Sequence, residues 1–308
     1  MWFIWLLLIL IFIKVYNKIT SGKCYSDAVL TGKVVIVTGG SNGLGFETAL
    51  DLARRGATTI LGCRDEIRGQ KAVRRIIKRT NNPRVSFIRL DLSSLASVRE
   101  FVKEFKSLGI KLDILINNAG VIGPSMEITE DGIVKDLQIN HFGPFLLTVL
   151  LVPLLKKSAP SRIIIVSSHL HKYGRINEVN TPRNYLQSFC NGKLCNVLFS
   201  NELARRLAET GVVVNSLHPG QVNTSFYRGT VLEKLRTLIL YTFFKSPADG
   251  SQTSVYLATS DECDMITGSY FADCKEQEMG KKANSYELAL KVWSLSEELV
   301  KLQPEEMI

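Results

Sequence analysis

The chain has 308 residues, which is enough for one large single-core domain or two small ones. Hydrophobic residues make up 45% of it and charged residues 22%, an ordinary globular composition that argues against disorder over most of the length. The formal net charge of +9 fits a solvated basic face first, and a nucleic acid, an anionic membrane surface or a phosphorylated cofactor as partner would also account for it.

An unbroken apolar run, Trp2–Ile13, stands at the start of the chain. It falls short of the roughly 20 residues of a clean membrane span, and counting on past Lys14 gives a marginal one. A cleaved signal peptide would place positive residues before the run, whereas Lys14, Lys18 and Lys23 follow it. We therefore expect residues 1–18 to be an uncleaved anchor in the endoplasmic reticulum or another internal membrane, with the domain facing the cytoplasm.

Short apolar runs alternate with helical patterns along the rest of the chain. We predict strands at Val34–Val37, Thr58–Gly62, Val85–Leu90, Ile114–Ile116, Ile163–Val166 and Val212–Leu217. We predict helices at Phe46–Arg55, Glu66–Arg79, Leu95–Phe105, Gly132–Lys157 and Phe189–Glu209. This alternation predicts a Rossmann-like α/β fold, a doubly wound parallel sheet with helices on both faces, in a single domain over residues 31–305.

The first predicted strand runs directly into a glycine-rich turn. Its residues are Thr38, Gly39, Gly40, Ser41, Asn42, Gly43, Leu44 and Gly45, spaced TGxxxGxG, and a helix follows. Glycines let the backbone turn tightly and approach a pyrophosphate, and the helix N-terminus supplies unpaired N–H groups. A glycine cluster alone is a weak signal. Because a predicted strand precedes this turn and a helix follows it, we predict a dinucleotide-binding site here.

The second predicted strand is followed by Cys63-Arg64. An acidic side chain there would bind the ribose hydroxyls of NAD, but Cys63 is not acidic and Asp65 comes one position late. The Arg64 guanidinium can pair with a 2′-phosphate, which favours NADP(H) over NAD(H). The alternative is that Arg64 only begins the basic helix behind it.

The densest basic stretch, Arg64–Arg79, has apolar residues at near-helical spacing, so we place its charges on the wet side of a helix. Aromatic residues do not interleave with them, so we predict no nucleic-acid partner. The apolar run Phe145–Leu155 is too short for a second membrane span, contains Pro153, and is predicted to be a buried helix. The cysteines and histidines lack metal-ligand spacing, so we predict reduced thiols and no metal.

Further segments follow the remaining strands in a fixed order: Asp91, then Asn117-Asn118-Ala119-Gly120, Asn140, Ser168 and Pro219-Gly220 with Thr224. Together with the glycine turn, they resemble the short-chain dehydrogenase/reductase family, especially its retinol-dehydrogenase-like membrane-anchored branch, over residues 31–275. The resemblance implies that Asp91 contacts the adenine, that Asn140 and Ser168 are catalytic, and that Pro219, Gly220 and Thr224 flank the nicotinamide. It implies cofactor contacts for Thr38, Gly39, Ser41, Asn42, Gly43, Leu44, Gly45, Arg64, Asn118, Ala119, Gly120 and Lys193.

The family's catalytic helix carries a tyrosine four residues before a lysine. The tyrosine gives a proton to the oxyanion left by hydride transfer, because the neighbouring ammonium lowers its pKa from about 10. Here Lys193 is in place, but the tyrosine position is Phe189. Tyr185, Tyr173 or a water could compensate, although Pro182 and Asn184 predict a loop around Tyr185, and simple loss of the acid is the expectation.

The resemblance implies an oxidoreductase, and Arg64 favours NADP(H) as its cofactor. The apolar character of Phe226–Phe244 suits a lipophilic alcohol or aldehyde of retinoid, steroid or prenyl type. A positioned acid is worth about 10²–10⁴ in rate, so we expect impaired turnover. The alternative is a catalytically silent NADP(H)-binding sensor or scaffold. The apolar segment Phe226–Phe244 would cover the substrate or be an ordinary core helix. By the same resemblance, the helices Leu137–Leu155 and Phe189–Glu209 correspond to the pair that forms the family's dimer. The alternative is that the membrane anchor favours a monomer.

Overall fold

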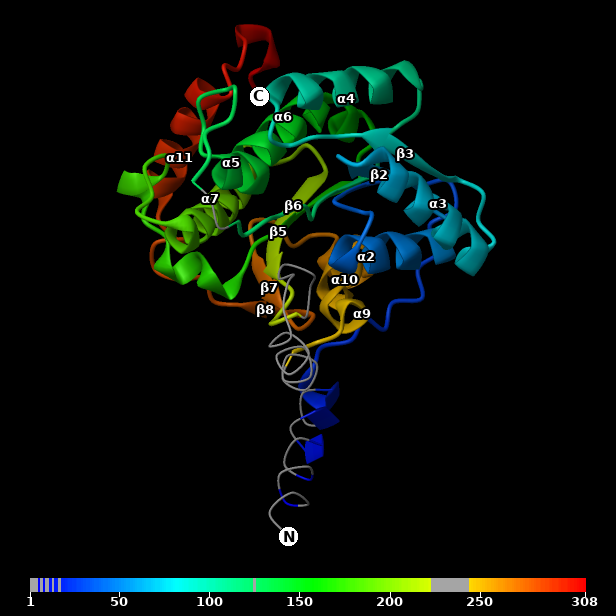
Figure 1. Cartoon of the computed structure of the whole chain (residues 1–308). Helices are drawn as coiled ribbons and strands as arrows, with labels where there is room; N and C mark the ends of the chain where they lie inside the picture. Colours follow the sequence, from blue (N-terminus) through cyan, green and yellow to red (C-terminus); the bar gives the residue numbers. More distant parts are fainter. Residues whose placement is uncertain are drawn as a thin grey trace.

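A computed structural model describes residues 5, 8, 11–12, 14–15, 18–123, 126–222 and 244–308. One sheet of eight strands runs through the domain in the order β3-β2-β1-β4-β5-β6-β7-β8 (Figure 1). The strands are β1 Val34–Thr38, β2 Thr58–Cys63, β3 Val85–Arg89, β4 Ile114–Asn117, β5 Ser161–Val166, β6 Val212–His218, β7 Tyr270–Ala272 and β8 Lys275–Gln277. The first seven are parallel and β8 is antiparallel to β7, so the predicted Rossmann-like sheet is confirmed as mostly parallel.

Helices cover both faces of this sheet because the runs in β1, β4 and β5 are apolar on both sides. One apolar core lies beneath α4 (Leu95–Ser107), α6 (Gly143–Lys157), α7 (Tyr185–Arg206) and α11 (Tyr286–Leu299). The other lies beneath α2 (Gly43–Arg54), α3 (Glu66–Thr80) and α10 (Gln252–Thr259), with α9 (Pro247–Gly250) beside α2. Short 3-10 turns, His169–Tyr173 (η2), Ile176–Glu178 (η3), Asp261–Cys263 (η4) and Pro304–Glu306 (η5), complete the elements.

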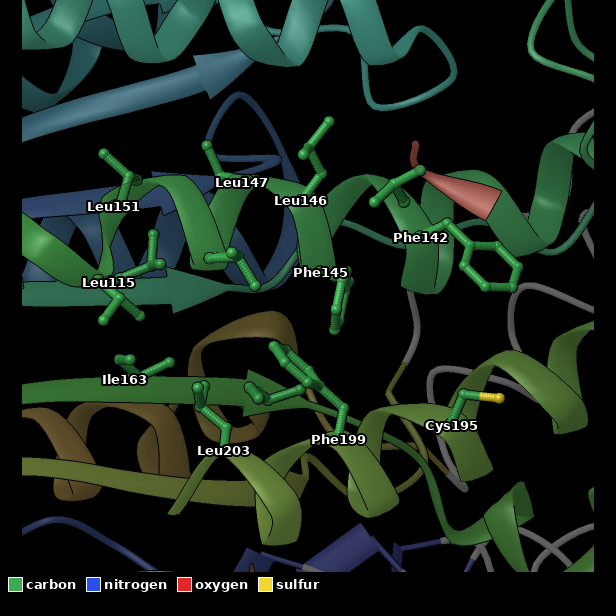
Figure 2. Packing of buried hydrophobic residues seen from close by; sticks show 14 of the residues in the cluster. Leu115, Phe142, Phe145, Leu146, Leu147, Leu151, Ile163, Cys195, Phe199 and Leu203 are labelled. Carbon is green, nitrogen blue, oxygen red and sulfur yellow. The ribbon is translucent and has the colours of Figure 1, made fainter. Parts of the chain in front are cut away.

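The long apolar helix is confirmed as a core element. One described helical stretch, Lys135–Lys157, is long and apolar enough to cross a membrane, but 83% of its most apolar window is buried inside the protein. Figure 2 shows Phe145 of α6 pointing toward Phe199 of α7, with Leu203 of α7 near Ile163 of β5. The stretch is therefore an internal helix that is held between its neighbours.

The sequence predicts that Gly132–Lys157 is mostly helix, and the structure divides this range into a short α-helix, a π turn and a longer α-helix. The helical stretch begins at Lys135 instead of Gly132, since Val134 forms an isolated bridge with Ile128. After the short α5 (Lys135–Leu137), a π turn over Gln138–Phe142 (η1) precedes α6. Such a π turn inserts an extra residue, and here it carries Asn140.

The start of α7 also corrects the sequence prediction. The loop expected around Tyr185 is wrong, because α7 begins at Tyr185. Asn184 has an extended backbone, and its side chain accepts a hydrogen bond from the Gln187 N–H at 2.9 Å. Asparagine at this position is a helix N-cap, which a loop interpretation mistakes for a break.

The described residues between Trp5 and Thr20 have helical backbone and project away from the domain (Figure 1). Among them, Trp5, Leu8 and Phe12 are at least half exposed. The role of residues 1–18 as a membrane anchor stays a prediction.

Candidate cofactor and catalytic site

A cleft of about 340 Å³ opens at the carboxyl ends of β1, β2 and β4. The sheet order reverses between β1 and β4, and such a switch point is where open α/β sheets bind ligands. Predicted cofactor residues from four separate segments line this cleft: Gly39, Ser41, Asn42, Gly43, Leu44, Gly45, Arg64, Asp91, Asn118, Ala119 and Gly120. The structure therefore brings these residues together on one surface.

The glycine turn needs its glycines at defined places. Gly39 and Gly43 have φ values of 68° and 56°, in the left-handed region. A Cβ on Gly45 would lie 2.5 Å from the Gly39 carbonyl oxygen and would collide with the Asn118 side chain. The turn is thus packed against itself, and α2 begins at Gly43 with its N-terminal N–H groups beside the cleft.

Thr38 and Asn118 tie β1 to β4 below the cleft. The Thr38 Oγ1 accepts hydrogen bonds from the N–H groups of Asn118 and Ala119, both at 3.0 Å. The Asn118 Nδ2 donates to the Thr38 carbonyl at 2.8 Å. These bonds fix the backbone on both sides of the switch point, which gives Thr38 and Asn118 a structural role besides the predicted contact.

The end of the cleft that follows β2 carries two guanidinium groups. Arg64 and Arg68 both line it, together with Cys63 and Asp65. Asp65 is engaged elsewhere: it caps α3 by accepting from the Arg68 N–H at 2.9 Å, and its other oxygen lies 3.3 Å from the Arg68 Nε. Sequence reasoning missed Arg68, although its position three residues after an N-cap aspartate was the available signal.

Asp91 follows β3 and lines the same cleft. Its Oδ1 accepts hydrogen bonds from the Ser93 N–H at 3.0 Å and the Ser93 hydroxyl at 2.6 Å. The Asp91 N–H in turn donates to the Ser97 hydroxyl at 3.0 Å. The carboxylate is therefore held in one orientation at the rim of the cleft.

Asn140, in the π turn, holds the backbone that leads away from the NNAG segment. Its Nδ2 donates to the carbonyl oxygens of Val121 and Asp136 at 2.8 and 2.7 Å, and its Oδ1 accepts from the Val121 N–H at 3.1 Å. A Cβ on Gly120 would lie 2.9 Å from this Oδ1 and 3.1 Å from the Lys193 Nζ. Asn140, Gly120 and Lys193 therefore meet at one point.

Lys193 is buried, and its Nζ donates to the Val166 carbonyl oxygen at 3.0 Å. Burial lowers the pKa of its ammonium to about 8, because the charged form loses hydration. The Nζ lies 5.6 Å from the ring centroid of Phe189, within cation–π range. A phenyl ring without a hydroxyl thus occupies the place beside the ammonium.

Ser168 follows β5 and begins the next 3-10 turn. Its Oγ accepts from the Leu170 N–H at 3.2 Å, which leaves the hydroxyl hydrogen to be donated. The preceding Ser167 hydroxyl donates to the Lys193 carbonyl at 2.7 Å and joins this strand end to α7. Ser168 and Lys193 are therefore presented by adjoining elements.

Tyr185 and Tyr173 stand apart from this arrangement. Their exposed fractions are 46% and 63%, whereas Phe189, one turn of α7 after Tyr185, is half-buried and Lys193 is buried. Pro219 and Gly220 follow β6, and Gly220 has a φ of 82° and donates its N–H to the His218 Nδ1 at 2.9 Å. Thr224 and positions 226–243 of the apolar segment lie outside the described residues.

Comparison with known proteins decides the family. Residues 33–234 match the family model of the short chain dehydrogenases. The chain belongs to the short-chain dehydrogenase/reductase family. Members of this family bind a nicotinamide cofactor, which agrees with the cleft at the switch point.

Relatives within the short-chain dehydrogenase/reductase family cover most of the chain. It is 45% identical over 295 residues to human Retinol dehydrogenase 14, covering 89% of this chain and 88% of that protein. A crystal structure of an uncharacterized Mycobacterium paratuberculosis protein is 32% identical, with a TM-score of 0.71, and the match covers 91% of this chain and 98% of that one. A short chain dehydrogenase from Burkholderia cenocepacia, in complex with NADP, is 25% identical with a TM-score of 0.63, covering 79% and 96%.

Proposed function

We propose that this protein is an NADP(H)-dependent oxidoreductase for lipophilic alcohols and aldehydes of the retinoid type, with turnover slowed by Phe189. The observation that carries the proposal is a cofactor cleft that ends at Gly120, where the Lys193 ammonium lies close by with a phenyl ring, that of Phe189, beside it. The name of the human relative, a retinol dehydrogenase, supports the retinoid class of substrate. Steroid and prenyl alcohols belong in the same test panel.

The cleft residues fit a dinucleotide. The glycine turn and the start of α2 would hold the pyrophosphate, because both line the cleft and the helix N-terminus supplies N–H groups there. Arg64 and Arg68 would hold a 2′-phosphate, while Asp65 is occupied in capping α3. The NADP complex of the Burkholderia relative supports NADP(H) in preference to NAD(H).

When bound, the nicotinamide would supply or accept a hydride. Ser168 would donate its hydroxyl hydrogen to the substrate oxygen, since its own oxygen already accepts from the Leu170 N–H. Lys193 would hold the ribose and keep a positive charge near the developing oxyanion. No hydroxyl at position 189 completes the proton transfer, and we therefore expect turnover about 10²–10⁴-fold below that of a tyrosine-bearing site.

A second function, a silent NADP(H) binder that acts as a sensor or scaffold, is favoured by the same residue. Phe189 removes the acid without disturbing Thr38, Asn118 or Asn140, whose hydrogen bonds shape the cofactor cleft. The two functions differ in turnover only. A protein that binds NADPH but reduces no aldehyde of the panel, even with tyrosine at position 189, would be the silent binder.

Membrane placement belongs to the same proposal. We propose that residues 1–18 anchor the protein in the endoplasmic reticulum membrane with the domain on the cytoplasmic side. The exposed apolar residues Trp5, Leu8 and Phe12 support this, because such side chains are costly in water. A lipophilic substrate would then be available from the bilayer that holds the enzyme.

The cofactor preference is tested by calorimetry on the purified full-length protein in detergent. We expect NADPH to bind at least about tenfold more tightly than NADH, since a guanidinium–phosphate pair contributes about 1.5–3 kcal/mol. Arg64→Leu is expected to remove most of this preference. Arg74→Leu is the matched control, because it removes the same charge from an exposed position of α3 that does not line the cleft.

Equal affinities of the wild type for NADPH and NADH would refute the NADP(H) preference while leaving the dinucleotide site intact. Binding of neither would remove the proposed function as a whole.

A further inference from the structure

Asp273, in the turn between β7 and β8, touches two segments that are far from it in sequence. Its Oδ1 accepts a hydrogen bond from the Gly22 N–H at 3.0 Å, and the same oxygen forms an ion pair with Lys245. Burial raises the pKa of this carboxyl, but the hydrogen bonds from Lys245 and Gly22 outweigh it and keep the pKa below its ordinary value. Asp273 is therefore a charged link between the N-terminal segment and Lys245.

Lys245 in turn holds the backbone after the predicted nicotinamide contact. Its side chain packs on Gly220, where a Cβ would lie 2.9 Å from both the Cε and the Nζ. Its N–H donates to the Gln221 carbonyl at 2.8 Å, and it pairs with Val222 in an isolated parallel bridge. Lys245 thus contacts three successive residues at the end of β6.

The N-terminal partner of Asp273 is seated firmly. A Cβ on Gly22 would collide with the Asp273 carbonyl group. The Cys24 N–H donates to the Gln252 side chain at 3.1 Å, and the Ser26 hydroxyl donates to the Thr259 carbonyl at 2.9 Å. This segment therefore lies along the turn and α10 directly after the predicted anchor.

These contacts form one continuous path from Gly22 through Asp273 and Lys245 to Gly220. We propose that Asp273 and Lys245 are positioning residues that couple the membrane-proximal segment, residues 21–26, to residues 219–222 after β6, where Pro219 and Gly220 are the predicted nicotinamide contacts. The consequence is that the position of residues 21–26, directly after the predicted anchor, affects the affinity for the lipophilic substrate. This inference rests on the proposed function for its substrate, and on the described contacts for the coupling itself.

The test uses the full chain in phosphatidylcholine nanodiscs and two variants that act at opposite ends of the path. Gly22→Ala displaces the membrane-proximal segment from the Asp273 backbone, and Asp273→Asn removes the charge that holds Lys245 but keeps an oxygen for the Gly22 N–H. We expect both to speed amide hydrogen exchange at residues 220–222. We expect both to weaken retinaldehyde binding about three- to tenfold, with NADPH affinity within about twofold of the wild type.

Two controls separate coupling from general loss of structure. Tyr25→Ala changes an exposed side chain of the same segment, 86% accessible, and is expected to leave exchange at 220–222 unchanged. Lys245→Met keeps the alkyl chain on Gly220 but removes the charge, so combining it with Asp273→Asn should add nothing further.

The proposal is overturned if Gly22→Ala speeds exchange at residues 21–24 but leaves both residues 220–222 and the retinaldehyde affinity as in the wild type. Fully additive effects of Asp273→Asn and Lys245→Met would overturn it as well. A wild type that binds neither NADPH nor retinaldehyde contradicts the proposed function instead, and the exchange rates still decide the coupling.

Discussion

The buried ammonium of Lys193 is suited to binding an anionic cofactor, but it lowers the stability of the cofactor-free domain. Its ammonium is buried with one carbonyl acceptor, Val166, and one aromatic face, Phe189. Burial disfavours the charge, so the pKa falls from 10.5 to about 8. A bound anionic cofactor would relieve this unfavourable state, which gives the lysine a role that does not depend on a neighbouring tyrosine.

A stability measurement checks this view of Lys193. A pKa lowered by folding means that the unfolded chain binds the proton more tightly, so the free energy of unfolding should rise as the pH goes from about 8 to 10.5. At neutral pH, Lys193→Met should therefore stabilise the cofactor-free protein by about 1–2 kcal/mol in urea denaturation. Lys71→Met, an exposed control, should change it little; a destabilised Lys193→Met would contradict the account.

His141 is a second buried titratable residue whose pKa affects the stability of the fold. It is fully buried, its Nδ1 lies 3.1 Å from the Asn196 Oδ1, and burial lowers its pKa to about 4. Between pH 6.5 and about 4 this histidine is protonated in the unfolded chain but not in the folded protein. The free energy of unfolding should therefore fall as the pH falls through this window, by on the order of 3 kcal/mol. His141→Gln should flatten that dependence in denaturant titrations; an unchanged pH slope would show that other groups cause it.

Some strands and helix boundaries can be predicted from the sequence, and others cannot. The six predicted strands are confirmed. Most are apolar runs buried in the sheet, whereas the edge strand β3 has buried Val85 and Ile88 and exposed Ser86 and Arg89. The strands β7 and β8 have three residues each, too few to show a period. A loop interpretation of Asn184 misses its role as the cap of α7, and the π turn at Asn140 has no sequence signal of its own. Motif order located the cleft, but the contacts of Lys245 became visible only in the three-dimensional structure.

The C-terminal helix α11 bears on the question of a dimer. Its Trp293 packs against Phe145 of α6 and Phe199 of α7, with ring centroids 5.2 and 5.8 Å apart, and Arg206 lies 4.1 Å above its ring. The resemblance to the family predicts that these two helices form a dimer interface. Because α11 covers α6 and α7, we expect it to occupy the surface that a second subunit would contact, and we expect the protein to be a monomer.

Light scattering of the detergent-solubilised protein, corrected for the detergent, should give the mass of one chain. Trp293→Ala should cost about 3–5 kcal/mol of stability, because it opens a cavity among buried aromatic rings. A stable dimer in the wild type would contradict the assignment of this surface to α11.

The whole molecule combines a Rossmann-like domain, a cofactor cleft at the switch point and an apolar N-terminus on a seated segment. Asp273 joins this segment at Gly22 to Lys245, which packs on Gly220 after β6. Catalysis is the separable part, because the change at Phe189 leaves the bonds around Thr38, Asn118 and Asn140 in place. The central claim is therefore a protein that binds its cofactor well and turns over slowly.

Compensation by another hydroxyl is checked by Tyr185→Phe, which should leave the wild-type turnover within about twofold, since the Tyr185 side chain is 46% exposed to solvent. The most direct test of the central claim is retinaldehyde reduction with NADPH by the wild type and Phe189→Tyr. We predict that the substitution raises kcat at least tenfold, toward the 10²–10⁴ of a positioned acid, with the Kd for NADPH within about twofold. A robust wild-type rate that rises less than about tenfold would contradict it.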